Sequence, residues 1–204
     1  MNTPSHVIIN LAIFSKLPLP QANLAIAIGA VLPDLPMFGF YIWLKYVRKM
    51  PSREIWSKAY FEPFWQNIFD VVNSIPLIVI GFAIAYYCNW PIAQVICLSM
   101  LLHCLFDLPV HNDDAHRHFL PFSNYRFISP FSYWDPRHHG GIVALLELIL
   151  VLLATLQVFP AIHSWLGKGL MLASNAFYIV GYLKFYVFSL MLGSLRKDRL
   201  PKSP

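Results

Sequence analysis

Residues 141–162 have the sequence GIVALLELILVLLATLQVFPAI, an apolar run that contains a single charged side chain, Glu147. A helix needs about 20 predominantly apolar residues to cross the hydrocarbon core of a bilayer, and this run is long enough. Further apolar runs occupy residues 74–89, 91–108 and 169–193. The sequence therefore predicts an all-α membrane protein, a bundle of about four transmembrane helices.

The composition of the whole chain supports this class. Of its 204 residues, 57% are hydrophobic and only 12% are charged, whereas soluble domains carry about 25% charged residues. The formal net charge is +5 at pH 7. Because the basic residues flank apolar runs and form no patch on a polar surface, we expect membrane lipid as a partner and no nucleic acid. With no internal repeat, residues 1–204 are expected to form one domain.

The N-terminal segment, residues 4–32, predicts a helical hairpin attached to the bundle. Two apolar segments of roughly 11 residues, each too short to span a bilayer, flank a proline-containing turn at residues 16–20. An antiparallel hairpin places its two ends side by side. We therefore expect His6, at the entry of the hairpin, to lie beside Asp34, at its exit.

The loop at residues 109–140, between two predicted spans, is rich in histidine and aspartate. His103 and Asp107, just before it, stand four residues apart on a predicted helix, so both side chains project from one face. Pro109 should end this helix, which lets His111 turn back over the same face. An imidazole and a carboxylate presented together suit a divalent metal ion such as zinc.

These positions together predict one metal site. The alternative is a buried histidine–aspartate hydrogen bond that stabilises the end of the helix. The expected ligands share a location at one end of the bundle, and they are His6, Asp34, His103, Asp107 and His111.

Three further residues are candidates for catalysis. His138 and His139 precede Gly140, Gly141 and the next span, and one of them could complete the metal shell while the other serves as general acid or base. A polar anchor for the loop is the alternative. Glu147 lies inside a predicted span, where charged side chains are costly and usually functional, so we expect it to support the site or relay protons.

The arginines of the loop are candidates for binding substrate. A guanidinium group can hold a phosphate through paired hydrogen bonds. Ordinary positive charge beside a membrane is the alternative interpretation. The residues concerned are Arg117, Arg126 and Arg137.

Three short motifs stand out, and they are Ser5-His6, Leu32-Pro33-Asp34 and the segment from His103 to Asp107. With them the chain resembles the YdjM-like family of bacterial inner-membrane, metal-dependent hydrolases. The resemblance covers most of residues 1–160 and implies a multi-pass membrane hydrolase with a bound metal ion. The histidine–aspartate pair is also similar to the zinc-dependent phospholipase C and nuclease fold, although the missing HxxxE pair after residue 111 argues against three metal ions.

The leading hypothesis is a membrane-bound, zinc-dependent hydrolase of a phosphoester or lipid-like substrate. The alternative is a non-catalytic membrane protein that binds a metal or supports the assembly of a complex. Basic clusters at residues 45–58 and 196–202 are expected to face the cytoplasm, which places the loop and the site on the cytoplasmic side of the bacterial inner membrane. An internal membrane is the alternative location.

Overall fold

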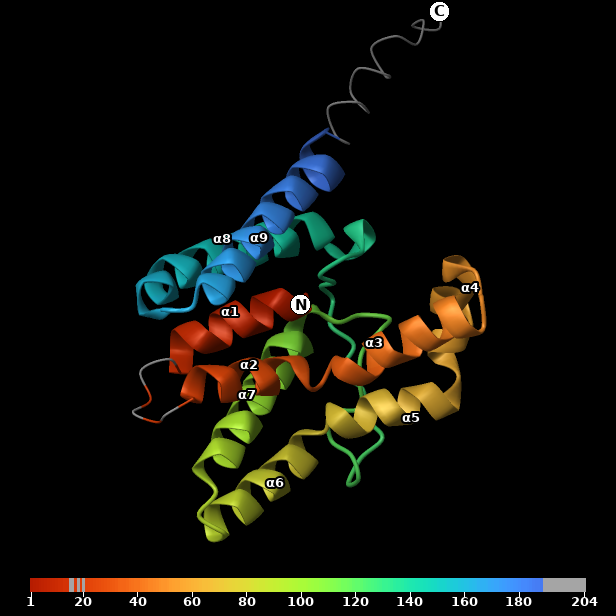
Figure 1. Cartoon of the computed structure of the whole chain (residues 1–204). Helices are drawn as coiled ribbons and strands as arrows, with labels where there is room; N and C mark the ends of the chain where they lie inside the picture. The colour runs from red at the N-terminus through yellow and green to blue at the C-terminus, as the bar shows by residue number, and fades with distance from the viewer. Residues whose placement is uncertain (15–16, 18, 20, 189–204) are drawn as a thin grey trace, which may run out of the picture.

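The computed structural model describes residues 1–14, 17, 19 and 21–188, and within them all regular structure is helical (Figure 1). The prediction of an all-α protein is thereby confirmed. The α-helices of the described residues are α1 (Thr3–Phe14), α2 (Ala22–Val31), α3 (Leu35–Ile42), α4 (Ser52–Ser57), α5 (Pro63–Val72), α6 (Ile75–Tyr87), α7 (Pro91–Asp107), α8 (Gly140–Val158) and α9 (Trp165–Tyr182). Short π- or 3₁₀-helical turns follow several of them, at Trp43–Val47, Ala59–Phe61, Leu108–Val110, Phe159–Ala161 and Leu183–Phe188, and another, Pro136–His138, precedes α8.

Three helices of the described residues are long and apolar enough to cross a membrane. They extend over Pro91–Val110, Gly140–Ala161 and Trp165–Phe188, and so coincide with three of the four predicted spans. The fourth predicted span, 74–89, corresponds to α6, which has only 13 residues and follows α5 at a bend of 41°.

Two bent pairs of helices therefore decide how many crossings the chain can make. Besides α5 and α6, the pair of α2 with α3 and its π-helical extension is bent by 55°. If each bent pair is one span, the number rises from three to five. The end of the predicted span 169–193 and the basic cluster at 196–202 lie outside the described residues.

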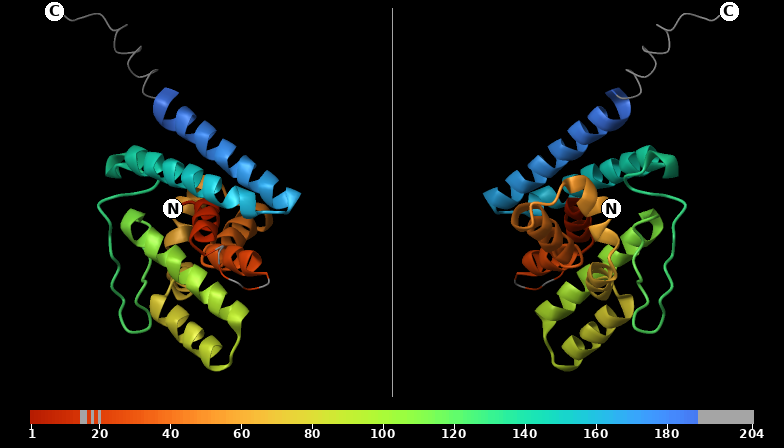
Figure 2. Two further views of the ribbon diagram at one scale, coloured as in Figure 1. Left: turned by 90° about the vertical axis from the view of Figure 1, so that its left-hand side faces the viewer. Right: turned by 90° about the vertical axis from the view of Figure 1, so that its right-hand side faces the viewer.

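The predicted N-terminal hairpin is present as α1 and α2, although most of the turn at residues 16–20 lies outside the described residues. The two helices pack side by side, with α7 crossing α2 and α8 covering α1 (Figures 1 and 2). Two buried polar residues tie the three helices together. The Asn10 amide donates to the Ser99 carbonyl at 2.9 Å, and the Ser99 hydroxyl donates to the Ile26 carbonyl at 2.6 Å.

A second, aromatic core lies between α3, α4 and α5. Phe40 is its centre, with 1% of its surface exposed, and the rings of Trp65 and Phe69 lie 5.0 and 5.4 Å from it in edge-to-face geometry. Such pairs add to the free energy gained by apolar burial. Trp65 and Phe69 therefore serve to pack these helices.

By contrast, α8 and α9 expose large apolar side chains along much of their length. On α8, Leu146, Leu153 and Leu156 are more than half exposed. Apolar surface of this extent is unusual in a protein surrounded by water, and it suits a helix that faces lipid.

The loop after α7 runs alongside α6, turns, and returns to the start of α8 (Figure 2). The Ile75 amide donates to the His118 carbonyl at 2.9 Å, which fixes the outgoing part of the loop to the start of α6. The Tyr133 amide donates to the Val110 carbonyl, also at 2.9 Å, which fixes the returning part to the end of α7. The loop is thus bound to the helices at both of its ends.

Gly29 permits the close contact between α2 and α7, and this contact can be tested. A Cβ atom at Gly29 would lie 2.4 Å from the Ile96 carbonyl oxygen and 2.7 Å from the Ser99 Cβ. We expect Gly29→Ala to lower the free energy of unfolding by about 1–3 kcal/mol because the two backbones must move apart. Thermal unfolding of the purified protein in detergent measures the loss.

The matched control is Gly39→Ala, because nothing lies within 4 Å of the Cβ position at Gly39 in helix α3. This variant should unfold at the wild-type temperature or slightly above it, since alanine favours helices more than glycine. Equal stability of the two variants would contradict the proposed contact.

Candidate metal centre

The last turn of α7 presents His103 and Asp107 on one face, as their spacing predicts. The Nε2 atom of His103 lies 3.0 Å from the Oδ2 atom of Asp107. The exposed fraction is 0% for His103 and 2% for Asp107. A carboxylate removed from water to this degree needs partners of opposite charge or several hydrogen bonds.

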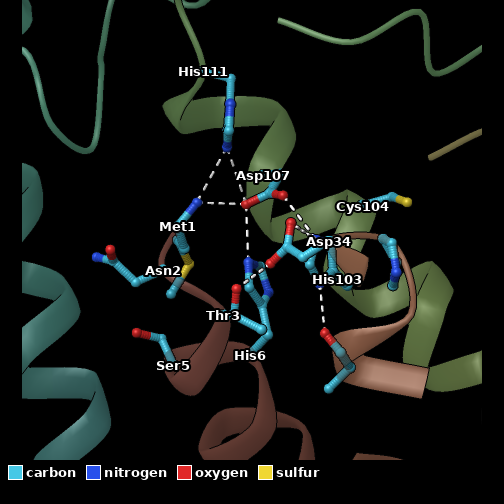
Figure 3. Close-up of polar contacts among 12 residues, drawn as sticks. Met1, Asn2, Thr3, Ser5, His6, Asp34, His103, Cys104, Asp107 and His111 are labelled. Atoms are coloured by element: carbon cyan, nitrogen blue, oxygen red, sulfur yellow. Dashed lines mark hydrogen bonds and ion pairs between the residues drawn. The ribbon is translucent and has the colours of Figure 1, made fainter. Parts of the chain in front are cut away.

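Helix α1 supplies a third side chain, His6, which is also fully buried. Its Nε2 atom lies 2.9 Å from the Oδ1 atom of Asp107, and its ring stacks on the His103 ring with centroids 3.7 Å apart (Figure 3). One ligand atom from each of the three residues lies within 4.8 Å of the others. This separation is compatible with three ligands of one ion, since zinc binds nitrogen and oxygen ligands at about 2.1 Å.

Asp34 reaches the same place from the break between α2 and α3. Pro33 and Pro36 flank it, and proline interrupts the hydrogen-bond pattern of a helix. The Thr3 hydroxyl donates a hydrogen bond to the Oδ2 atom of Asp34, and the Oδ1 atom of Asp34 lies 3.6 Å from the Nε2 atom of His103 (Figure 3). The helix break therefore directs a second carboxylate toward the histidine pair.

The hydrogen bond on the other side of the His103 ring fixes the position of its proton. The Nδ1 atom lies 2.8 Å from the Ala30 carbonyl oxygen, and a carbonyl can only accept, so Nδ1 carries the hydrogen. In the neutral ring, Nε2 then directs a lone pair at the carboxylates of Asp34 and Asp107. Such an arrangement is repulsive unless a second proton or a metal ion lies between them. A backbone carbonyl that orients a histidine in this way is typical of metal ligands.

His111 differs from the other two histidines because carboxylates flank both of its nitrogens. Nε2 lies 3.3 Å from Asp107 Oδ1, and Nδ1 lies 3.1 Å from Asp114 Oδ2. Burial disfavours the charged ring, but the two carboxylates outweigh it and raise the pKa of His111 to about 9. The Met1 nitrogen lies 2.5 Å from Asp107 Oδ1 and 3.3 Å from His111 Nε2. In this arrangement His111 is a charge partner, and it must lose a proton before it can ligate a metal.

The structure thus brings the five predicted ligands together around one carboxylate, that of Asp107. His6, His103 and Asp107 form the inner group, while Asp34 and His111 approach it from two sides. Whether they hold a metal ion remains a prediction. The aspartate explains the clustering in either case, since it is the buried charge that the other groups surround.

Glu147 on α8 is connected to α1 and not to the loop. The Asn2 backbone and side-chain amides donate to its Oε1 atom at 2.9 and 3.1 Å, and the Ser5 hydroxyl also donates to it. The Ser5 hydroxyl lies 2.6 Å from the hydroxyl of Tyr178 on α9. Sequence reasoning missed the roles of Asn2 and Tyr178, for which no spacing or motif gives a signal.

His138 and His139 lie at the junction of the loop with α8. His139 has a left-handed backbone (φ 61°), and its ring lies 5.5 Å from that of Phe131. Within the described residues, no hydrogen bond or ion pair joins either histidine to Asp107. Arg137, 80% exposed at its side chain, pairs with Asp135 at 2.7 Å. The catalytic and substrate-binding roles expected for these three residues stay predictions.

Arg117 and Arg126 both contact the buried side chain of Asp70 on α5. The distances to Oδ2 are 2.6 Å from Arg117 Nε and 2.9 Å from Arg126 Nη2, and His116 Nδ1 lies 3.2 Å from Oδ1. These bonds fix the middle of the loop to the helix. A role of the two arginines in phosphate binding would require them to leave this carboxylate or to share it.

The comparisons with known proteins add no family to this geometry. No family model, no curated protein and no solved structure matches the chain. The resemblance to membrane-bound hydrolases therefore stays a prediction from short motifs.

The contacts of Asp70 predict how the loop can be released. Asp70→Asn removes the charge that holds Arg117 and Arg126, and breaking a buried ion pair costs about 3–5 kcal/mol. We expect the loop to detach, so that trypsin cleaves after Arg117 and Arg126 faster than in the wild type. Limited proteolysis in detergent, with fragments identified by mass spectrometry, measures the rates.

Glu62→Gln is the matched control, because Glu62 is exposed and has no ion pair among the described residues. Its cleavage rate in the loop should equal that of the wild type. An Asp70→Asn loop that is as resistant as the wild-type loop would show that the ion pairs do not hold it.

Proposed function

We propose that this protein is a membrane-embedded hydrolase that uses a divalent metal ion, with zinc as the first expectation, to cleave a phosphoester or lipid-like substrate. His6, His103 and Asp107 would hold the ion, and Asp34 lies near enough to join them. The observation that carries the proposal is the fully buried His103 ring. Its Nε2 atom has no hydrogen-bond partner among the described residues and faces two carboxylates.

The donor set fits the proposed ion. Imidazole nitrogens and carboxylate oxygens are the ligands that zinc takes in catalytic sites, where three protein ligands leave a position open. Such an ion polarises a phosphoryl oxygen and activates water for attack. The Thr3 hydroxyl would orient Asp34 by donating a hydrogen bond to its Oδ2 atom. The Ala30 carbonyl would orient His103 by accepting a hydrogen bond from its Nδ1 atom.

A large apolar cavity next to the site favours a lipid-like substrate. It has a volume of about 710 Å³ and is lined mainly by apolar side chains of α1, α2 and α9. Thr3 lies in its wall, and the same residue bonds to Asp34. An acyl chain in this cavity would place its polar end close to the proposed ion.

The test is elemental analysis of the protein purified in detergent and incubated with zinc or manganese. We expect about one ion per wild-type chain. His103→Ala and Asp107→Asn each remove one ligand from a three-ligand set and should lower the bound metal about tenfold or more, because even indirect partners of a metal site cost 10–100-fold in affinity. Loss of metal should abolish hydrolysis of phosphodiester and phospholipid substrates.

Glu62→Gln is the matched control, since Glu62 is exposed, has no ion pair among the described residues and lies neither in the metal centre nor in the wall of the apolar cavity. This variant should keep the wild-type metal content. Circular dichroism shows whether each variant folds. A well-folded wild-type protein that binds no ion under any of these conditions would overturn the proposal and leave the cluster as a structural ion-pair network, the scaffold alternative.

A further inference from the structure

A cavity with aromatic walls lies on the other side of the candidate metal centre. It has a volume of about 370 Å³ and lies between α8, α9 and the returning part of the loop. Its volume falls in the range of small-molecule sites. Seven of its twelve wall residues are aromatic, and those that the argument uses are Tyr133, Trp134, Tyr178, Tyr182 and Tyr186.

The carboxylate of Glu147 lies in the wall of this cavity. Glu147 is 3% exposed, and its partners, Asn2 and Ser5, are neutral donors. No lysine, arginine, histidine or amino group of the described residues lies within ion-pair distance of it. A buried carboxylate is costly without a cation to balance it. The carboxylate in the wall therefore has no counter-ion among the described residues, and a cation bound in the cavity would balance its charge.

Aromatic faces beside a carboxylate attract organic cations. The ring faces carry negative potential, and several rings around one cation form the aromatic cage that recognises quaternary ammonium groups. A primary ammonium needs three hydrogen-bond acceptors, whereas a trimethylammonium group needs carbon surface and negative potential. Apolar surface makes up the greater part of this wall, so it fits the trimethylammonium group better.

The cavity adjoins the candidate metal centre through two residues. Asn2 lines the cavity and follows Met1, whose nitrogen lies 2.5 Å from Asp107. Tyr133 lines it from the loop, and its ring lies 5.0 Å from that of His111. A ligand whose cation lies beside Glu147 would thus extend a bonded phosphate toward the histidine–aspartate cluster.

We propose that the cavity of Glu147, Trp134, Tyr178, Tyr182 and Tyr186 binds a quaternary ammonium group of the choline type. That this group belongs to the substrate rests on the proposed hydrolase function, but its binding does not. A choline phosphoester carries both groups that this arrangement needs. Its trimethylammonium group would lie in the aromatic cavity, and its phosphate would lie toward the metal centre. Tyrosine and tryptophan are also the residues enriched where lipid headgroups meet a membrane protein.

The experiment is equilibrium binding of radiolabelled choline to the purified chain in detergent, with tetramethylammonium as competitor. We expect saturable binding that tetramethylammonium displaces and that dimethylbutanol, the neutral carbon isostere of choline, does not. Glu147→Gln keeps the hydrogen-bond acceptor but removes the charge, and it should weaken binding about tenfold. Glu62→Gln, an exposed carboxylate elsewhere, should leave binding unchanged.

A second pair of variants separates loss of binding from loss of folding. Tyr182→Leu removes a ring and should weaken choline binding severalfold, whereas Tyr182→Phe keeps the ring and should bind as the wild type does. Absence of saturable binding in the wild type, or equal displacement by dimethylbutanol, would overturn the proposal. So would undiminished binding to a folded Glu147→Gln variant.

The choline-binding result can be interpreted separately from the metal proposal, because the metal content is measured on the same preparations. Choline binding without a metal ion would keep this inference and overturn the hydrolase. A bound metal ion without choline binding would overturn this inference and leave the hydrolase proposal standing. Competition by phosphatidylcholine vesicles against free phosphocholine distinguishes a lipid headgroup from a soluble ester, and the stronger competitor identifies the source.

Discussion

The buried carboxylate of Asp107 is the constraint on which the rest of the site depends. Its side chain is almost completely buried, so the chain must surround it with positive or donor groups. These groups come from segments far apart in the sequence, His6 of α1 and His111 after α7, together with His103 on its own helix. Packing α1 against α7 is therefore a requirement of the charge as well as of the apolar core.

The parts of the site that follow helical periodicity could be predicted from the sequence. A spacing of four residues puts His103 and Asp107 on one face, and a hairpin places His6 near Asp34, whatever the details of packing. The contacts of Glu147 and Asp70 could not be predicted. They depend on which helix lies opposite and on the course of a non-repeating loop, so the sequence carries no periodic signal for Arg117 or for Ser5.

The fold shows the same division between local and long-range information. Long apolar runs give α7, α8 and α9, whose length and apolar composition make them candidates to cross a membrane. Within the run at 74–89, helix α6 extends from Ile75, where Ser74 caps its start, to Tyr87, and a bend of 41° separates it from α5. Hydropathy does not detect such a bend, so the number of spans is less predictable than their helical nature.

The polar contacts of α1 have a consequence for the order in which the protein assembles. Among the described residues, Asn10 bonds to Ser99 of α7, His6 to Asp107 of α7, and Ser5 to Glu147 of α8. Polar side chains without partners are costly in the hydrocarbon of a membrane. Because α1 precedes α7 and α8 in the chain, its polar side chains would acquire these partners only after the later helices have formed, so we expect α1 to join the bundle late.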